Sequence, residues 1–141
     1  KEDGKRVVLL GTEKESELMN RIRNSDQSKT IKIIPPVNLR VLTGFLKKSR
    51  LFIGNDSGLM HLAAMVGVPV LGIFGPGSPE TTGPYMAMEK QEVVTKNFSC
   101  SPCKQRFFKE CKPSPLNKPY CLEDITVKDV HEAVRRLLKR Y

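Results

Sequence analysis

The feature that most constrains the fold is a pair of apolar segments joined by a polar turn and a helical pattern, at residues 51–76. Residues 51–53 are apolar, residues 54–58 read Gly-Asn-Asp-Ser-Gly, and apolar residues then recur at helical spacing until Gly67 and Pro69 end the helix. Residues 70–74 form a second apolar run, as expected of a buried parallel strand. This order predicts a parallel α/β unit, in which ligands bind beyond the carboxyl ends of the strands.

The polar turn is the first candidate binding site. A helix that begins near Ser57 leaves its first amides without helical partners, and these amides suit a phosphate. Gly58 would let a ligand approach the backbone closely. Asp56 either caps the helix, which the residues alone favour, or points at a neutral group such as a sugar hydroxyl. His61 is read first as a structural histidine bonded to backbone and second as a general base.

The rest of the chain alternates between strand and helix patterns. Expected strands are residues 6–11, 31–34 and 91–95, and expected helices follow Thr12 and cover residues 38–49 and 126–140. Thr126 and Asp129 have the offset of a capping box at the start of the last helix. Residues 75–84 are expected to be a connecting loop. The alternation predicts a parallel sheet with helices on both faces.

Composition limits the class of protein. The 141 residues make one domain or part of one, and 39% apolar residues allow a real core. The net charge of +9 is uneven, with +3 in residues 1–95 and +6 in residues 96–141. A basic chain suits nucleic acid, an anionic lipid surface or an anionic small substrate, but no nucleic-acid-binding motif is visible. Without an apolar stretch of membrane-spanning length or a signal sequence, a cytoplasmic location is expected.

Four cysteines form a second candidate site. Cys100, Cys103, Cys111 and Cys121 have the spacing C-x2-C-x7-C-x9-C. Four thiols, two of them at knuckle spacing, could bind tetrahedral zinc. The downstream pair lacks the C-x2-C spacing, and a reducing cytosol disfavours disulfides, so free structural thiols are the favoured interpretation.

The central segment resembles a known family. Asn-Asp-Ser-Gly-Leu-Met-His-Leu-Ala-Ala at 55–64, followed by Gly-Val-Pro-Val-Leu-Gly-Ile-Phe-Gly-Pro at 67–76, is similar to the signature of glycosyltransferase family 9, the ADP-heptose:lipopolysaccharide heptosyltransferases. The resemblance implies a Rossmann-like parallel sheet, like the C-terminal half of a two-domain GT-B enzyme. Residues 1–141 would then be part of a nucleotide-sugar-binding domain, with a Cys-rich insertion at about 97–122 and a closing helix at about 126–140.

The resemblance also implies roles for individual residues. Residues 11–15 match the family pattern Gly-x-x-x-Glu, whose glutamate contacts the donor ribose, although spacing alone makes Glu15 a surface carboxylate near a helix start. Asp56 would bind the sugar, and residues 75–84 would form a wall of the donor pocket. The candidate substrate-binding set is Glu15, Asp56, the amides of Ser57, Gly58 and Leu59, His61, and Thr81 or Thr82 for a phosphate.

The implied activity is transfer of a heptose from ADP-heptose to the inner core of lipopolysaccharide. The base and the binding site for the lipopolysaccharide core or lipid A acceptor would lie in an N-terminal domain that this sequence lacks, so the isolated chain is expected to be inactive. No cofactor is expected, since the chain has no Asp-x-Asp motif. Nucleic acid is not an expected partner, whereas peripheral contact with the inner membrane is. The alternatives are another nucleotide-sugar enzyme of GT-B shape, such as an epimerase, and a non-enzymatic zinc or nucleic-acid module.

Overall fold

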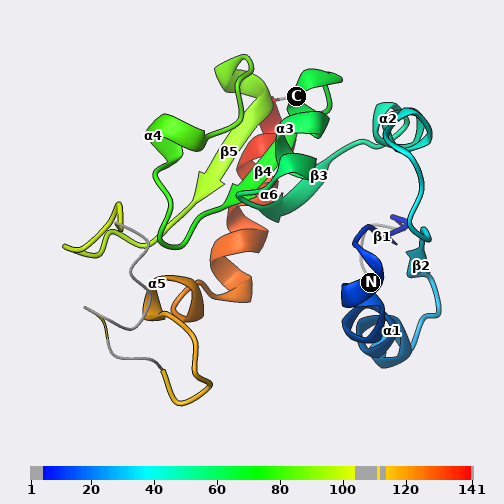
Figure 1. Cartoon of the computed structure of the whole chain (residues 1–141). Helices are drawn as coiled ribbons and strands as arrows, with labels where there is room; N and C mark the ends of the chain where they lie inside the picture. The colour runs from blue at the N-terminus through cyan, green and yellow to red at the C-terminus, as the bar shows by residue number, and fades with distance from the viewer. Residues whose placement is uncertain (1–4, 104–110, 112–113, 141) are drawn as a thin grey trace. The chain divides into compact units, whose positions relative to one another are not determined.

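The computed structural model describes residues 5–103, 111 and 114–140 (Figure 1). The chain divides into two compact units, Lys1–Leu42 and Thr43–Tyr141. All strand pairings between described residues are parallel. The expected α/β class is therefore confirmed, with the difference that the described strands form two sheets instead of one.

The first unit is a small strand–helix–strand arrangement. Strand β1 (Val8–Leu9) pairs with β2 (Lys32–Ile33), and between them the 3-10 helix η1 (Glu13–Glu15) leads into α1 (Ser16–Ser25). Both strands are shorter than the apolar runs predict, because only two residues of each are paired. Helix α1 contacts β2 and buries Met19. Helix α2 (Leu39–Lys47), near its predicted bounds, contains the boundary between the two units.

The second unit is built on a three-stranded sheet in the order β3-β4-β5. The strands are β3 (Phe52–Asn55), β4 (Val70–Ile73) and β5 (Gln91–Val94), and helix α3 (Gly58–Met65) connects the first two. Phe52 is paired with Val70, and Val70 with Gln91, so the three strands start and end together. Their carboxyl ends consequently form one edge of the sheet.

Two helices cover opposite faces of this sheet. Neighbouring strand residues point to opposite faces. Leu71 packs with Val94, Ala133 and Leu137, which places α6 (Val127–Arg140) on one face. A Cβ on the next residue, Gly72, would lie 3.1 Å from the Met60 sulfur, which places α3 on the other. The second unit therefore has the predicted helices on both faces.

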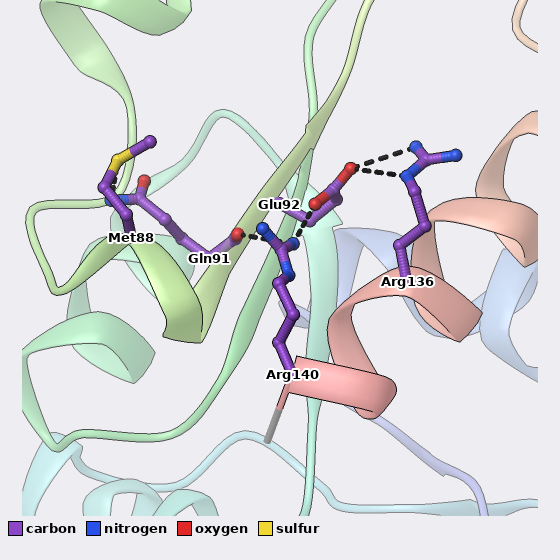
Figure 2. Close-up of polar contacts among 5 residues, drawn as sticks. All are labelled: Met88, Gln91, Glu92, Arg136 and Arg140. Carbon is purple, nitrogen blue, oxygen red and sulfur yellow. Dashed lines mark hydrogen bonds and ion pairs between the residues drawn. The ribbon is translucent and has the colours of Figure 1, made fainter.

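A carboxylate and two arginines attach α6 to β5 (Figure 2). Glu92 Oε1 accepts a hydrogen bond from Arg136 Nε at 3.0 Å and forms an ion pair with Arg136 Nη2 at 2.9 Å. Arg140 Nη2 donates to Glu92 Oε2 and, at 3.2 Å, to the carbonyl of Gln91. The Glu92 side chain is only 14% exposed, so this group holds the helix end against the strand.

The capping box predicted at the start of α6 is confirmed. Asp129 Oδ2 accepts hydrogen bonds from the amide and hydroxyl of Thr126 at 2.7 and 2.8 Å, and the Asp129 amide donates to the Thr126 hydroxyl at 3.2 Å. Lys96 Nζ lies 2.9 Å from the same carboxylate oxygen. The Thr126 amide, then Lys96 and the Thr126 hydroxyl, lower the pKa of Asp129 to about 2.

Three short elements differ from the sequence-based expectation. The segment expected to be a plain loop contains one helical turn, α4 (Pro79–Thr82). Its signals are local, because Pro79 occupies the first helical position and Ser78 precedes it. The 3-10 helix η2 (Met88–Lys90) and helix α5 (Tyr120–Glu123) were not predicted either. Within the described part of the chain, no helix has the length and apolar character needed to cross a membrane.

Candidate functional site

The candidate site lies where β3 and β4 end. Strand β3 runs to Asn55, and the next amide, that of Asp56, donates to the carbonyl of Ile73 at the end of β4 at 3.3 Å. Helix α3 then begins at Gly58, with Ser57 in the N-cap position in an extended conformation. The predicted placement of the turn at the carboxyl ends of the strands is confirmed. The interpretation of Asp56 as the helix cap is wrong, because the cap is one residue later.

The first amides of α3 are not used inside the helix. Met60 and His61 are the first residues whose amides bond to a helix carbonyl, and both use Ser57 O, at 3.1 and 3.3 Å. The amides of Gly58 and Leu59 precede these bonds, as at any helix start. A Cβ on Gly58 would meet nothing within 4 Å, so the backbone there is approachable. This end of α3 has the amides, the dipole and the space that an anionic group requires.

Asp56 is held by a residue from a different element. Thr82, at the end of α4, donates its hydroxyl hydrogen to Asp56 Oδ2 at 2.8 Å. Gly77 lies against the same oxygen, since a Cβ there would be 2.8 Å from it. The other carboxylate oxygen, Oδ1, is 4.0 Å from His61 Nε2. The structure thus brings together three residues of the predicted set, Asp56, His61 and Thr82.

These contacts change the interpretation of His61 and the threonines. The His61 side chain is 44% exposed and its Nε2 faces the Asp56 carboxylate, whereas the first interpretation was a structural histidine bonded to backbone. Thr82 was expected to be available to a phosphate, but its hydroxyl is engaged with the carboxylate. The Thr81 hydroxyl donates to the carbonyl of Ser78 at 3.2 Å.

Glu15 belongs to the first unit and has a local structural partner. Its Oε2 accepts hydrogen bonds from both the amide and the hydroxyl of Thr12 at 2.7 Å, which completes a capping box at η1. The hydrogen bond from the Thr12 amide, followed by that from its hydroxyl, lowers the pKa of Glu15. Thr12 and Glu15 were each predicted to lie at this helix start, and the structure joins them by hydrogen bonds. Contact of Glu15 with a ribose stays a prediction.

The cysteine segment is anchored next to the site. The Cys103 amide donates to the carbonyl of Pro76 at 2.9 Å, and the neighbouring Gly75 packs against Leu122 of α5. All four cysteines are free thiols. Burial, and then the charges of the other three thiols, raise the pKa of Cys121.

The described residues contain no group of three or more His, Cys, Asp or Glu that could hold a metal ion. The zinc interpretation of the four cysteines therefore has no support in the described geometry. Part of the insertion expected at residues 97–122 lies outside the described residues.

Sequence reasoning missed the loop contacts that hold Asp56. Gly77 stands in Gly-Pro-Gly-Ser-Pro, which reads as a rigid connector, although the following Ser78 and Pro79 signal a helical turn. That signal could have placed Thr82 at the end of a helix. It could not have placed Thr82 next to a carboxylate 26 positions earlier in the chain.

The fold and the site define a class of protein. A parallel α/β unit with an approachable helix N-terminus, a carboxylate and a histidine at the carboxyl ends of two strands is a Rossmann-like ligand-binding domain. The family model described as glycosyltransferase family 9 (heptosyltransferase) matches residues 1–112. This chain belongs to glycosyltransferase family 9.

Individual relatives agree with this assignment. Lipooligosaccharide heptosyltransferase 2 of Campylobacter jejuni subsp. jejuni serotype O:2 is 33% identical over 137 residues, which cover 94% of this chain and 41% of that protein. The structure of E. coli ADP-heptose lps heptosyltransferase II matches 97% of this chain and 38% of its own, with 25% identity and a TM-score of 0.75. The family 9 glycosyl transferase of Veillonella parvula DSM 2008 matches 98% of this chain and 38% of its own, with 25% identity and a TM-score of 0.79.

The chain thus spans about two fifths of the length of the relatives it matches. The family and these relatives favour the glycosyltransferase interpretation over both alternatives.

Proposed function

We propose that this chain supplies the donor-binding part of an enzyme that transfers a heptose from ADP-heptose to the inner core of lipopolysaccharide. The observation that carries the proposal is the position of Asp56 beside the start of α3, at the carboxyl ends of two strands, in a member of family 9. The name of the E. coli relative gives ADP-heptose as its donor and lipopolysaccharide as its acceptor.

In this proposal the start of α3 binds the donor diphosphate. The backbone amides of Ser57, Gly58 and Leu59 donate hydrogen bonds to phosphate oxygens, and the helix dipole adds to the attraction. An acceptor hydroxyl oxygen forms a bond to the anomeric carbon while the bond from that carbon to the diphosphate breaks. ADP leaves with the bonding electrons, and the helix end stabilises the negative charge that develops on it. The hydroxyl proton passes to a base outside this chain.

The carboxylates and the histidine bind neutral groups of the donor. Asp56 accepts a hydrogen bond from a heptose hydroxyl. His61 faces Asp56 Oδ1 and therefore lies beside the same part of the donor. Glu15 keeps Oε1 for a ribose hydroxyl while its Oε2 is bonded to Thr12. The Thr81 hydroxyl, which donates to the Ser78 carbonyl, can donate to a phosphate oxygen of the donor instead.

The acceptor is the lipopolysaccharide core or its lipid A part. It is bound mainly by portions of the protein beyond this chain, at the cytoplasmic face of the inner membrane. The excess of basic residues, 24 against 15 acidic ones, favours contact with an anionic lipid surface.

The proposal is tested by calorimetric titration of the full-length protein with ADP-heptose and ADP. UDP and GDP, which carry other bases, serve as control ligands. The adenine compounds are expected to bind selectively. Asp56→Asn should weaken binding of ADP-heptose more than that of ADP, because it removes a sugar contact, and Glu15→Gln should weaken both.

Asp124→Asn, at an exposed position after α5, is the matched control and should leave both affinities unchanged. Equal binding of ADP and UDP, or Asp56→Asn affinities equal to those of Asp124→Asn, would contradict the proposal.

A further inference from the structure

Two acceptors lie within hydrogen-bond distance of the Thr82 hydroxyl. It lies 2.8 Å from Asp56 Oδ2 and 3.1 Å from the carbonyl of Ser78 in the preceding helical turn. A hydroxyl has one hydrogen to donate. A bond to an ionised carboxylate is stronger than one to a neutral carbonyl, so Asp56 is the favoured acceptor. Thr81 has the ordinary helical bond to the Ser78 carbonyl instead.

The two oxygens of Asp56 have different surroundings as a result. Oδ2 lies between the Thr82 hydroxyl and the backbone at Gly77, where a Cβ would come within 2.8 Å of this oxygen. Oδ1 faces His61. The Asp56 side chain is 32% exposed, so the carboxylate can be reached by a ligand.

Without this hold, Asp56 has a competing position. It directly precedes the N-cap residue Ser57, which makes no side-chain hydrogen bond to the helix amides. Aspartate side chains at helix starts readily accept hydrogen bonds from those amides. A carboxylate turned onto the Gly58 and Leu59 amides would occupy the place of an anionic ligand and repel it.

We propose that Thr82 is a positioning residue, whose hydroxyl turns Asp56 away from the amides of α3 and presents Oδ1 toward the donor sugar. The inference rests on the proposed function for the identity of the donor, but the orientation of Asp56 can be measured without it. It assigns Thr82 to Asp56 and not to a phosphate of the donor.

The test uses three variants of the full-length protein. Thr82→Val removes the hydroxyl and keeps the shape of the side chain. Thr82→Ser keeps the hydroxyl and removes the methyl group. Thr30→Val is the matched control. Thr30 also donates its hydroxyl to an aspartate, Asp26, at 3.3 Å, in the other unit of the chain. We expect Thr82→Val to lower kcat for ADP-heptose by about ten-fold or more, the loss expected for one hydrogen bond to a charged group.

The dissociation constant for ADP separates positioning from phosphate binding. If Thr82 acts through Asp56, Thr82→Val weakens ADP affinity through competition by the displaced carboxylate, and this loss disappears in an Asp56→Ala background, where no carboxylate remains to compete. Thr82→Ser should recover most of kcat, and Thr30→Val should match the wild type. A loss of ADP affinity on Thr82→Val that persists in the Asp56→Ala background would overturn the inference in favour of a phosphate contact.

A crystal structure of Thr82→Val keeps the test decisive if the donor is not ADP-heptose. The expected result is an Asp56 carboxylate rotated toward the first amides of α3. An Asp56 side chain that stays in place would overturn the inference even if turnover falls. Absence of heptose transfer by the wild type would instead refute the proposed function, and the orientation of Asp56 in the variant would still decide the role of Thr82.

Discussion

Substitution of Glu92 by glutamine should measurably destabilise the attachment of α6 to the sheet. Glu92 accepts hydrogen bonds from two arginines, and its side chain is 14% exposed (Figure 2). Glutamine keeps the shape but removes the charge. Its amide nitrogen cannot accept a hydrogen bond, so the two arginines can no longer each donate to a separate oxygen. The arginine side chains are 57% and 41% exposed, so solvent weakens both interactions.

The expected magnitude follows from this partial exposure. A hydrogen bond to a charged group contributes about 1.5–3 kcal/mol when well buried, and an exposed ion pair about 0.2–1 kcal/mol. The Glu92 carboxylate is mostly buried, whereas both guanidinium groups are exposed. The contribution of each arginine to the free energy of unfolding should therefore lie near the upper end of the range for exposed ion pairs and below the range for well-buried hydrogen bonds. Glu92→Gln should therefore lower the free energy of unfolding by about 1–2 kcal/mol.

The measurement is urea-induced unfolding followed by far-UV circular dichroism. Glu132→Gln is the matched control on the same helix, because Glu132 pairs with Lys128 at 3.9 Å in an exposed position. The control should change the free energy of unfolding by less than about 0.5 kcal/mol. If Glu92→Gln and Glu132→Gln proved equally stable, the attachment by Glu92 would be energetically irrelevant and the reasoning from burial would be refuted.

Three further predictions concern the same unit. Leu137→Ala, at a fully buried position, should cost about 2–5 kcal/mol in the free energy of unfolding, and a cost below 1 kcal/mol would mean that α6 is not part of the core. The lowered pKa of Asp129 contributes stability that is complete above the ordinary aspartate pKa of about 3.9 and is lost as the pH falls toward 2. The melting-temperature difference between wild type and Asp129→Asn should therefore be full at pH 6 and shrink below pH 4; a constant difference would contradict this. The raised pKa of Cys121 predicts slower alkylation at pH 8 than at the exposed Cys100, and mass spectrometry of iodoacetamide-treated protein measures both rates.

The parts of the fold that the sequence predicted well are those with strong local signals. The strand–helix–strand segment was predicted because apolar runs, Gly67 and Pro69 are contiguous, and Gly67 does adopt the left-handed conformation (φ +82°) that ends a helix. The buried side of α3 was less accurate. Met60, Ala63 and Ala64 are buried, whereas Leu59 and Leu62, which lie at the helical spacing of the apolar pattern, are only partly buried. In a helix this apolar, periodicity leaves the direction of the buried face poorly determined.

Long-range side-chain partners were beyond the sequence. Thr82 and Glu92 find their partners 26 and 44 positions away, and no spacing rule connects such residues. Local pairs were accessible, as the capping box of Thr126 and Asp129 demonstrates. The candidate site was therefore predictable as a set of residue types at a strand end, but its internal contacts required coordinates.

The order of the elements also has a consequence for synthesis of the chain. Leu71 packs against Leu137, which is 66 residues further along the sequence. At translation rates of about 5–20 residues per second, synthesis of these 66 residues takes about 3–13 s, so α6 is completed that long after β4. During this time the Leu71 face of the growing sheet exposes apolar surface, while the α3 face is already covered. A nascent chain halted between α3 and α6 should therefore bind chaperones through one face of the sheet only.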